Sequence, residues 1–115
     1  YRWIQILEIE HIYSKKRQEN ENSLKEKSSL ESLGNKALLE KNINIRASDY
    51  RFTDKIKYYH GYTSANGKLK SGTKVQELLK LSNEKSDYTE QDIVERKKSI
   101  IEGFIEYLKD NELIV

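Results

Sequence analysis

The fold is decided by residues 8–44 of this 115-residue chain, which read EIEHI at positions 8–12 and LGNKALLE at positions 33–40, with Asn44 shortly after. An acidic residue directly before a histidine, an asparagine directly after a glycine, and a second asparagine nine residues later form one ordered set. Each part alone is common at strand ends, turns and helix starts. The order and spacing of the whole set carry the information.

Local patterns around this set predict two strands followed by a helix. Residues 3–13 alternate between two faces and are rich in Trp, Ile and Tyr, which favours a strand. Residues 36–40 predict a second, short strand, and residues 42–59 predict a helix with a break near Ser48-Asp49. Neighbours in a regular strand point to opposite faces, so the acidic residue and the histidine reach one site only if the strand ends or twists there. We expect it to end there.

The remaining segments predict loops and helices. Residues 14–29 are polar and favour a solvated loop or a short exposed helix, and Gly34 permits a close approach or a positive φ. Residues 61–72 hold three of the five glycines and predict a loop. Residues 73–81 open with capping-box form and predict a short helix, and Thr89 is the expected N-cap of the last helix. The apolar stripe that we expect this last helix to bury consists of Ile93, Ile100, Ile101, Phe104, Ile105 and Leu108.

Composition narrows the class of protein. Hydrophobic and charged residues make up 36% and 35% of the chain, so the core is expected to be modest. Cysteine is absent, which excludes disulfides and cysteine-ligated zinc. No apolar run approaches the ~20 residues of a membrane helix, and the first residues do not open a signal peptide, so a cytoplasmic location is expected. Methionine is absent even at position 1, and we therefore expect a single domain, residues 1–115, from the C-terminal end of a longer protein.

Charge is distributed unevenly along the chain. Residues 1–70 carry 14 Lys and Arg against 9 Asp and Glu, a net charge of +5. Residues 71–115 carry 7 against 10, a net charge of −3. The basic part contains the ordered set, and a polyanion bound there would gain from the local positive potential. The alternative is that the lysine-rich segments are only soluble surface.

The ordered set resembles the motif of HNH nucleases, and its details resemble the HNH domain at the C-terminal end of GmrSD-type restriction endonucleases. The resemblance covers most of residues 8–109 and is carried by Ile9–Tyr13, Leu33–Asn35, Leu38–Glu40, Ile43–Asn44, Ala47–Ser48, Phe52, Lys55, Tyr58, Tyr88–Ile93 and Arg96. It implies an α+β fold with a ββα-metal (HNH) motif and additional packed C-terminal helices. The chain departs from the family at Ser14, often Pro, and at Lys36, often Leu.

The activity implied by this resemblance is that of a divalent-metal-dependent DNA endonuclease with one Mg²⁺ or Mn²⁺ ion. His11 is the candidate general base, because an imidazole with an unperturbed pKa of about 6.5 is largely neutral at pH 7–8. Glu10 and Asn44 are the candidate metal ligands, since carboxylate and amide oxygens suit hard cations, and Glu8 is a second candidate carboxylate. The resemblance further implies that Asn35 orients the base.

Other residues are candidates for contact with nucleic acid. Arg46, Arg51, Lys55 and Lys57 could line the phosphate backbone, although a solvated helix face is the alternative. His60 is interpreted as structural or as a phosphate contact. The eight tyrosines could stack on bases but are expected mainly to fill the core. DNA is the expected partner, and the resemblance adds an N-terminal ParB-like nucleotide-hydrolysing domain in the full-length chain and a role in restriction or anti-phage defence.

Two rival functions remain open at this point. The first is a non-catalytic nucleic-acid-binding module that retains the fold, and the second is a helical protein-interaction domain. A metal-dependent nicking assay separates the enzyme from both rivals. Salt-dependent binding to DNA separates the rivals from each other.

Overall fold

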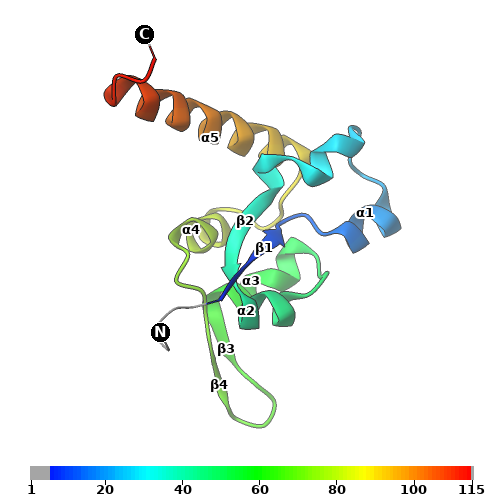
Figure 1. The fold of residues 1–115 in the computed structure, drawn as a ribbon. Coiled ribbons are helices and arrows are strands. Elements are labelled where there is room, and N and C mark those ends of the chain that lie inside the picture. Colours follow the sequence, from blue (N-terminus) through cyan, green and yellow to red (C-terminus); the bar gives the residue numbers. More distant parts are fainter. Residues whose placement is uncertain (1–5, 115) are drawn as a thin grey trace.

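A computed structural model describes residues 6–114 and shows a mixed α and β chain (Figure 1). In chain order, the helices and strands, with η marking 3₁₀ helices, are β1 (Leu7–His11), α1 (Lys15–Glu21), η1 (Lys27–Glu31), η2 (Leu33–Asn35), β2 (Lys36–Glu40), α2 (Lys41–Ala47), α3 (Phe52–His60), β3 (Gly61–Thr63), β4 (Leu69–Ser71), α4 (Gln76–Glu84) and α5 (Glu90–Asp110). The strand predicted over 3–13 is observed as β1, and residues 3–5 lie outside the described residues.

Strands β1 and β2 pair in antiparallel register, and α2 follows β2 directly. Strand β1 ends at His11, as predicted, and β2 has the predicted bounds. The predicted break in the following helix is also confirmed, because α2 ends at Ala47 and α3 begins at Phe52. Ser48 closes α2 with a φ of 48°, a left-handed value that a helix cannot continue through.

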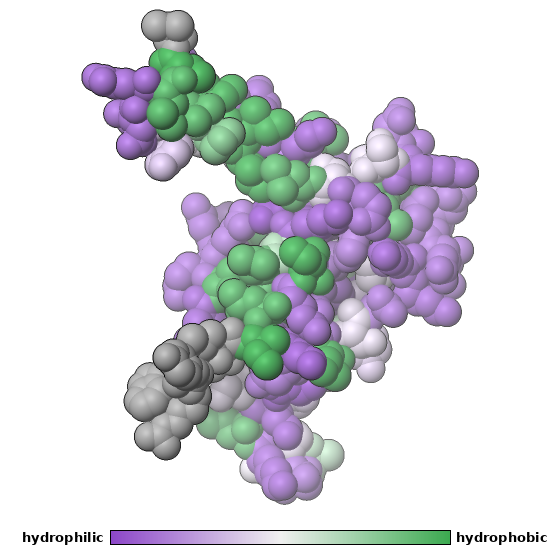
Figure 2. All heavy atoms as spheres, viewed as in Figure 1, coloured by the Kyte–Doolittle hydropathy of each residue, from purple (hydrophilic) through white to green (hydrophobic). Residues whose placement is uncertain are grey.

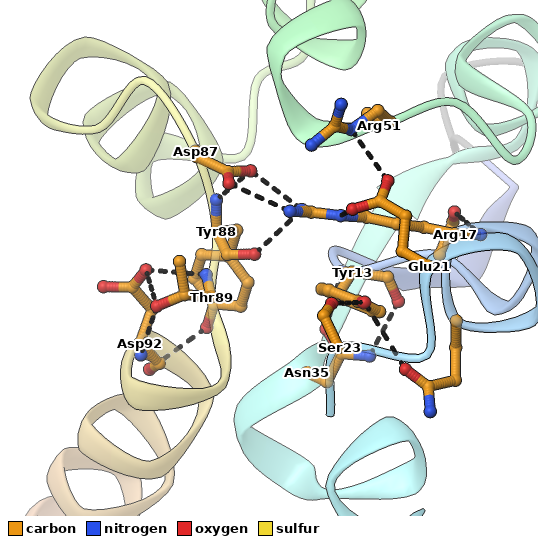
Figure 3. A network of polar contacts seen from close by, with 12 residues as sticks. Tyr13, Arg17, Glu21, Ser23, Asn35, Arg51, Asp87, Tyr88, Thr89 and Asp92 are labelled. Carbon is orange, nitrogen blue, oxygen red and sulfur yellow. Dashed lines mark hydrogen bonds and ion pairs between the residues drawn. The ribbon is translucent and has the colours of Figure 1, made fainter. Parts of the chain in front are cut away.

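The insert between β1 and β2 is tied to the rest of the chain by buried polar contacts (Figure 3). Its helix α1 is capped by Ser14, whose hydroxyl accepts from the backbone N–H of Arg17. Arg17 is buried and donates from its two terminal nitrogens to the carboxylate oxygens of Asp87, at 2.8 and 2.9 Å. A bidentate pair of this kind fixes orientation as well as distance. The polar insert is therefore docked on the segment that precedes α5.

The core is small and contains several large aromatic side chains. Its buried apolar residues are Ile12, Tyr13, Leu24, Ala37, Leu39, Ile43, Ala47, Phe52, Tyr59, Leu78, Tyr88 and Ile93. The ring of Phe52 packs against those of Tyr59 and Tyr88, with centroid distances of 6.3 Å and 5.8 Å. The expectation that tyrosines fill the core holds for Tyr13, Tyr59 and Tyr88.

A glycine sets the distance between η2 and α5. A Cβ atom added to Gly34 would lie 1.9 Å from the carbonyl oxygen of Ile93 and 3.0 Å from the backbone nitrogen of Lys97. Of the two roles expected for Gly34, the structure shows the close approach of two backbones and not a positive φ. Only a residue without a Cβ lets these two backbones meet.

Two local predictions are wrong. The loop expected over 61–72 contains the antiparallel hairpin β3–β4, in which Tyr62 lies opposite Lys70. The capping box expected at residues 73–76 is absent, since α4 begins at Gln76 without a side-chain cap. The hydroxyl of Thr73 instead accepts from the backbone N–H of Val75, at 3.0 Å, and donates to the buried carboxylate of Glu40, at 2.6 Å.

The N-cap predicted for the last helix is confirmed, because Thr89 caps α5, and together with Asp92 it also forms a capping box. The prediction that the apolar stripe is buried holds only for Ile93, whereas Ile101 and Phe104 are 43% and 59% exposed. At 21 residues, or about 31 Å, α5 extends beyond the elements on which its first turns pack (Figures 1 and 2). Within residues 6–114, none of the helices combines the length and apolar character that crossing a membrane requires.

Two glycine substitutions test this packing. Gly34→Ala should lower the free energy of unfolding by roughly 3 kcal/mol or more, because its methyl group would overlap a backbone carbonyl. Gly103→Ala is the matched control, since its Cβ would meet nothing within 4 Å in the middle of a helix, and it should raise stability by about 0.5–1 kcal/mol. Urea denaturation measures both. Equal stabilities for the two variants would contradict the close contact of η2 with α5.

Candidate functional site

Glu10, His11 and Asn44 of the ordered set meet at one polar hollow, whereas Asn35 does not line it. The hollow has a volume of about 370 Å³ and lies where β1 ends beside α2 and α3. Its lining consists of Ile9, Glu10, His11, Lys15, Asn44, Ile45, Ser48, Asp49 and Lys55. The structure therefore brings together three of the four residues expected at the catalytic and metal site, Glu10, His11 and Asn44, and places Lys55 beside them. The end of the strand lets the adjacent side chains of Glu10 and His11 reach the same space.

Glu10 belongs to a buried polar cluster at the base of this hollow. Its Oε2 accepts a hydrogen bond from the hydroxyl of Tyr59 at 2.6 Å and forms an ion pair with Nζ of Lys55 at 3.2 Å. Burial, followed by the charge of Glu10, raises the pKa of Tyr59 well above its usual range, so the phenol stays protonated and donates. No hydrogen bond to Oε1 of Glu10 is found in residues 6–114, which leaves this oxygen for a ligand.

Lys55 has a different position from the one predicted. It is 1% exposed, so it does not lie on a solvated helix face, which was the alternative to a contact with phosphate. Its ammonium donates to the backbone carbonyl of His11 at 2.7 Å as well as facing Glu10. Burial lowers the pKa of Lys55, and the charge of Glu10 opposes that shift. Lys55 thus joins α3 to the end of β1 and supplies a fixed positive charge under the hollow.

The imidazole of His11 is held by a residue that the sequence did not suggest. Nε2 of His11 lies 3.1 and 3.2 Å from the two carboxylate oxygens of Glu31, in η1. The same carboxylate faces the ammonium groups of Lys36 at 3.0 Å and Lys15 at 3.6 Å. Hydrogen bonds from Lys36 and from His11 lower the pKa of Glu31 to about 2. Glu31 is therefore ionised at every pH above about 3 and accepts from the ring.

Asn35 forms hydrogen bonds with the backbone that follows His11 and not with the imidazole ring of His11. The residue is fully buried, and its Oδ1 accepts from the backbone N–H of Tyr13 at 2.6 Å. Its Nδ2 donates to the carbonyls of Tyr13 and Leu30, both at 2.9 Å, and its own carbonyl accepts from Ile12 at 3.0 Å. Between residues 6 and 114, no hydrogen bond joins Asn35 to the imidazole, so direct orientation of the base by Asn35 is not observed.

The oxygens available for a cation come from a small donor set. Nδ2 of Asn44 donates to Oε1 of Glu8 at 2.9 Å, which leaves the amide oxygen of Asn44 for a ligand. No group of three or more His, Cys, Asp and Glu side chains suited to a metal ion occurs in the described part of the chain. Glu8, Glu10 and Asn44 together offer carboxylate and amide oxygens. This set fits a hard cation that keeps several of its waters, as Mg²⁺ does.

The other predicted residues lie at the surface around α2 and α3. Arg46 is half-buried and donates to the carbonyl of Asn42, while Arg51 is exposed and pairs with Glu21 at 3.1 Å. Lys57 is exposed. The ring of His60 lies 2.7 Å from the hydroxyl of Ser82, away from the hollow.

Sequence reasoning missed Glu31 and Tyr59. Glu31 lies 20 residues from His11 inside the polar insert, where one glutamate among several gives no signal. Tyr59 follows Lys55 by four residues, which places both on one face of a helix. That spacing could have suggested that the two side chains share a partner.

Comparison with known families gives one match. The family described as GmrSD restriction endonucleases, C-terminal domain, matches residues 2–102. No curated protein and no solved structure matches the chain.

The pairing of Lys55 with Glu10 predicts a large cost for removing one partner. Lys55→Met should lower the free energy of unfolding by roughly 3–5 kcal/mol, because the carboxylate of Glu10 stays buried without a counter-charge. The double variant Lys55→Met, Glu10→Gln should recover most of that loss. Lys57→Met, two residues further along α3 and exposed, is the control and should change stability by less than about 0.5 kcal/mol in urea denaturation. Equal losses for Lys55→Met and Lys57→Met would contradict the buried pair.

Proposed function

Because this chain belongs to the family of GmrSD restriction endonuclease C-terminal domains, we propose that it is a divalent-metal-dependent endonuclease that hydrolyses phosphodiester bonds in DNA and serves restriction or anti-phage defence. The observation that carries the proposal is that Glu10, His11 and Asn44 line one hollow beside the sequence β1–β2–α2. A ββα-metal centre has this order of elements. On resemblance alone, the proposal includes a ParB-like nucleotide-hydrolysing domain as partner.

His11 acts as the general base in this proposal. With Nε2 directed to the ionised carboxylate of Glu31, the ring carries its proton on Nε2 and leaves the lone pair of Nδ1 to accept a proton from water. A base held in this way needs no reorientation before it accepts the proton, which is what positioned general bases contribute. Asn35 serves the same end indirectly, because it fixes the backbone directly after His11.

Glu10 and Asn44, with Glu8 beside Asn44, would hold one Mg²⁺ or Mn²⁺ ion. When bound, the ion supplies charge neutralisation at the scissile phosphate. The protein itself adds the cation of Lys55, which lies 3.2 Å from the buried carboxylate of Glu10. Since that cation already offsets one carboxylate, the protein alone would hold the metal weakly, and phosphate oxygens of the substrate would be needed as further ligands.

The surface that would face DNA is the segment from α2 to β4. Residues 41–70 carry seven Lys and Arg against two Asp, a net charge of +5, so they contain the whole excess of the basic part of the chain. Arg46, Arg51 and Lys57 lie on this segment and are the proposed phosphate contacts. Such contacts release counterions, so binding weakens steeply with added salt.

A substitution of the proposed base tests the function directly. His11→Ala should slow the nicking of supercoiled plasmid in Mg²⁺ or Mn²⁺ by roughly 10²–10⁴-fold, because proton abstraction is lost. Its thermal midpoint and its affinity for DNA in EDTA should stay close to those of the parent, since the ring is partly exposed and contacts an exposed carboxylate.

His60→Ala is the matched control, because His60 also contacts one side chain but lies outside the hollow. It should nick at the parental rate. Parental activity in His11→Ala, or loss of activity in both variants, would overturn the assignment. A parent that binds DNA and cuts none with either metal would favour the rival, non-catalytic binding module.

The proposed metal ligands predict a shift in metal requirement rather than loss of binding. Asn44→Ala and Glu8→Gln should each raise the Mg²⁺ concentration that gives half-maximal nicking by roughly tenfold or more, and excess Mn²⁺ should restore part of the rate. Asn42→Ala, on the exposed side of α2, should leave that concentration unchanged. An unchanged metal titration for Asn44→Ala would remove Asn44 from the site.

A further inference from the structure

Three tyrosines form a continuous row of rings at the surface, and the middle one, Tyr58, also packs against the core. The rings of Tyr50 and Tyr58 are stacked, with centroids 5.8 Å apart and planes 15° from parallel. The ring of Tyr62 meets Tyr58 edge-on, at 5.2 Å and 83°. The row runs from the segment before α3, along that helix, to the first strand of the hairpin.

These rings are more exposed than the tyrosines at the centre of the core. Tyr13, Tyr59 and Tyr88 are at most 1% exposed, whereas Tyr50 is 48% exposed and the other two members of the row are half-buried. An aromatic side chain contributes to folding through the surface that it buries. The open surface of the row is available for a ligand with flat faces.

Positive charge accompanies the row. Nζ of Lys57 lies 4.9 Å from the ring centroid of Tyr58 and 5.6 Å from that of Tyr62. Lys70 lies opposite Tyr62 across the β3–β4 pair. The row also begins at the rim of the catalytic hollow, since Tyr50 directly follows Asp49, which lines it. A strand that entered the hollow could continue along the row.

We propose that Tyr50, Tyr58 and Tyr62 form a stacking surface for unpaired nucleobases, with Lys57 and Lys70 beside the phosphates of the same strand. The identity of the ligand as DNA rests on the proposed function. Flat aromatic faces and neighbouring cations are the two elements by which proteins bind single strands without sequence preference. Paired bases are already stacked on their neighbours and expose no face, so the surface selects single-stranded or locally opened DNA over intact duplex.

Oligonucleotide binding in EDTA tests this surface without cutting. The probes are fluorescein-labelled oligo(dT) and a blunt duplex of the same length, measured by fluorescence anisotropy. Tyr50→Ala and Tyr62→Ala should each weaken binding of the single strand by about fivefold to a hundredfold, the range for losing one stacked base. Duplex affinity should change by less than twofold in both variants.

Two further variants serve as controls. Tyr50→Phe keeps the ring and should bind as the parent does, which separates stacking from hydrogen bonding by the hydroxyl. Tyr107→Ala removes an equally exposed tyrosine, stacked on Phe104 in α5, and should leave both affinities unchanged. Because Tyr50 is half exposed, its alanine variant is expected to keep the parental thermal midpoint.

The outcomes separate a failure of the stacking surface from a failure of the proposed nuclease activity. Equal weakening for single strand and duplex, no weakening in folded Tyr50→Ala, or a parent that binds no single strand would overturn the stacking surface. If the parent nicks plasmid while its tyrosine variants bind normally, the nuclease proposal is supported and the stacking surface is overturned. If the parent never nicks but binds single strands through Tyr50 and Tyr62, the stacking surface is supported and the nuclease proposal is overturned.

Discussion

The arrangement of the site depends on how Asn35 closes the insert. From a fully buried position, its side chain exchanges two hydrogen bonds with the backbone of Tyr13, and its carbonyl accepts from Ile12. These bonds join residues 22 positions apart and set β2 against β1 in register. Loop closure costs entropy that grows only slowly with length, so one well-bonded clamp can hold a polar insert of this size. Without that register, the end of β1 and the start of α2 would not flank one hollow.

In this protein, polar side-chain pairs join segments that are distant in the sequence, a role that apolar contacts play in a larger core. Lys55 with Glu10, and Arg17 with Asp87, each tie together segments more than 40 residues apart in the sequence. Within the described residues, every side-chain nitrogen and oxygen that is itself fully shielded from solvent has a hydrogen-bond partner. Pairs of this kind contribute little net stability, yet breaking one is costly, so they favour one arrangement over its alternatives. This matters most under the hollow, where Lys55 fixes the backbone of His11.

The sequence predicted what depends on short spacings and failed where distant residues decide. The end of β1, the bounds of β2, the break at Ser48 and the cap at Thr89 follow from local patterns, and all are observed. The meeting of Glu10, His11 and Asn44 at one hollow was instead expected from the resemblance to HNH nucleases, since Asn44 lies 33 residues after His11. The partner of the His11 ring, the burial of Lys55 and the contact of Thr73 with Glu40 depend on residues 20 or more positions away, which periodicity cannot reveal.

The stripe on α5 was misjudged for a related reason, since helical spacing shows that residues share a face but not what covers it. The exposed end of α5 also carries acidic residues that lie far from the basic part of the protein. Residues 102–115 carry one Lys against four Asp and Glu, which accounts for the whole negative excess of the second part of the chain. Glu106 lies 13 residues beyond Ile93, or about 20 Å along the helix. At physiological salt, charges interact over about 8 Å, so this acidic end is too remote to weaken the positive potential of residues 41–70. The fold thus separates its acidic end from the basic surface that surrounds the hollow.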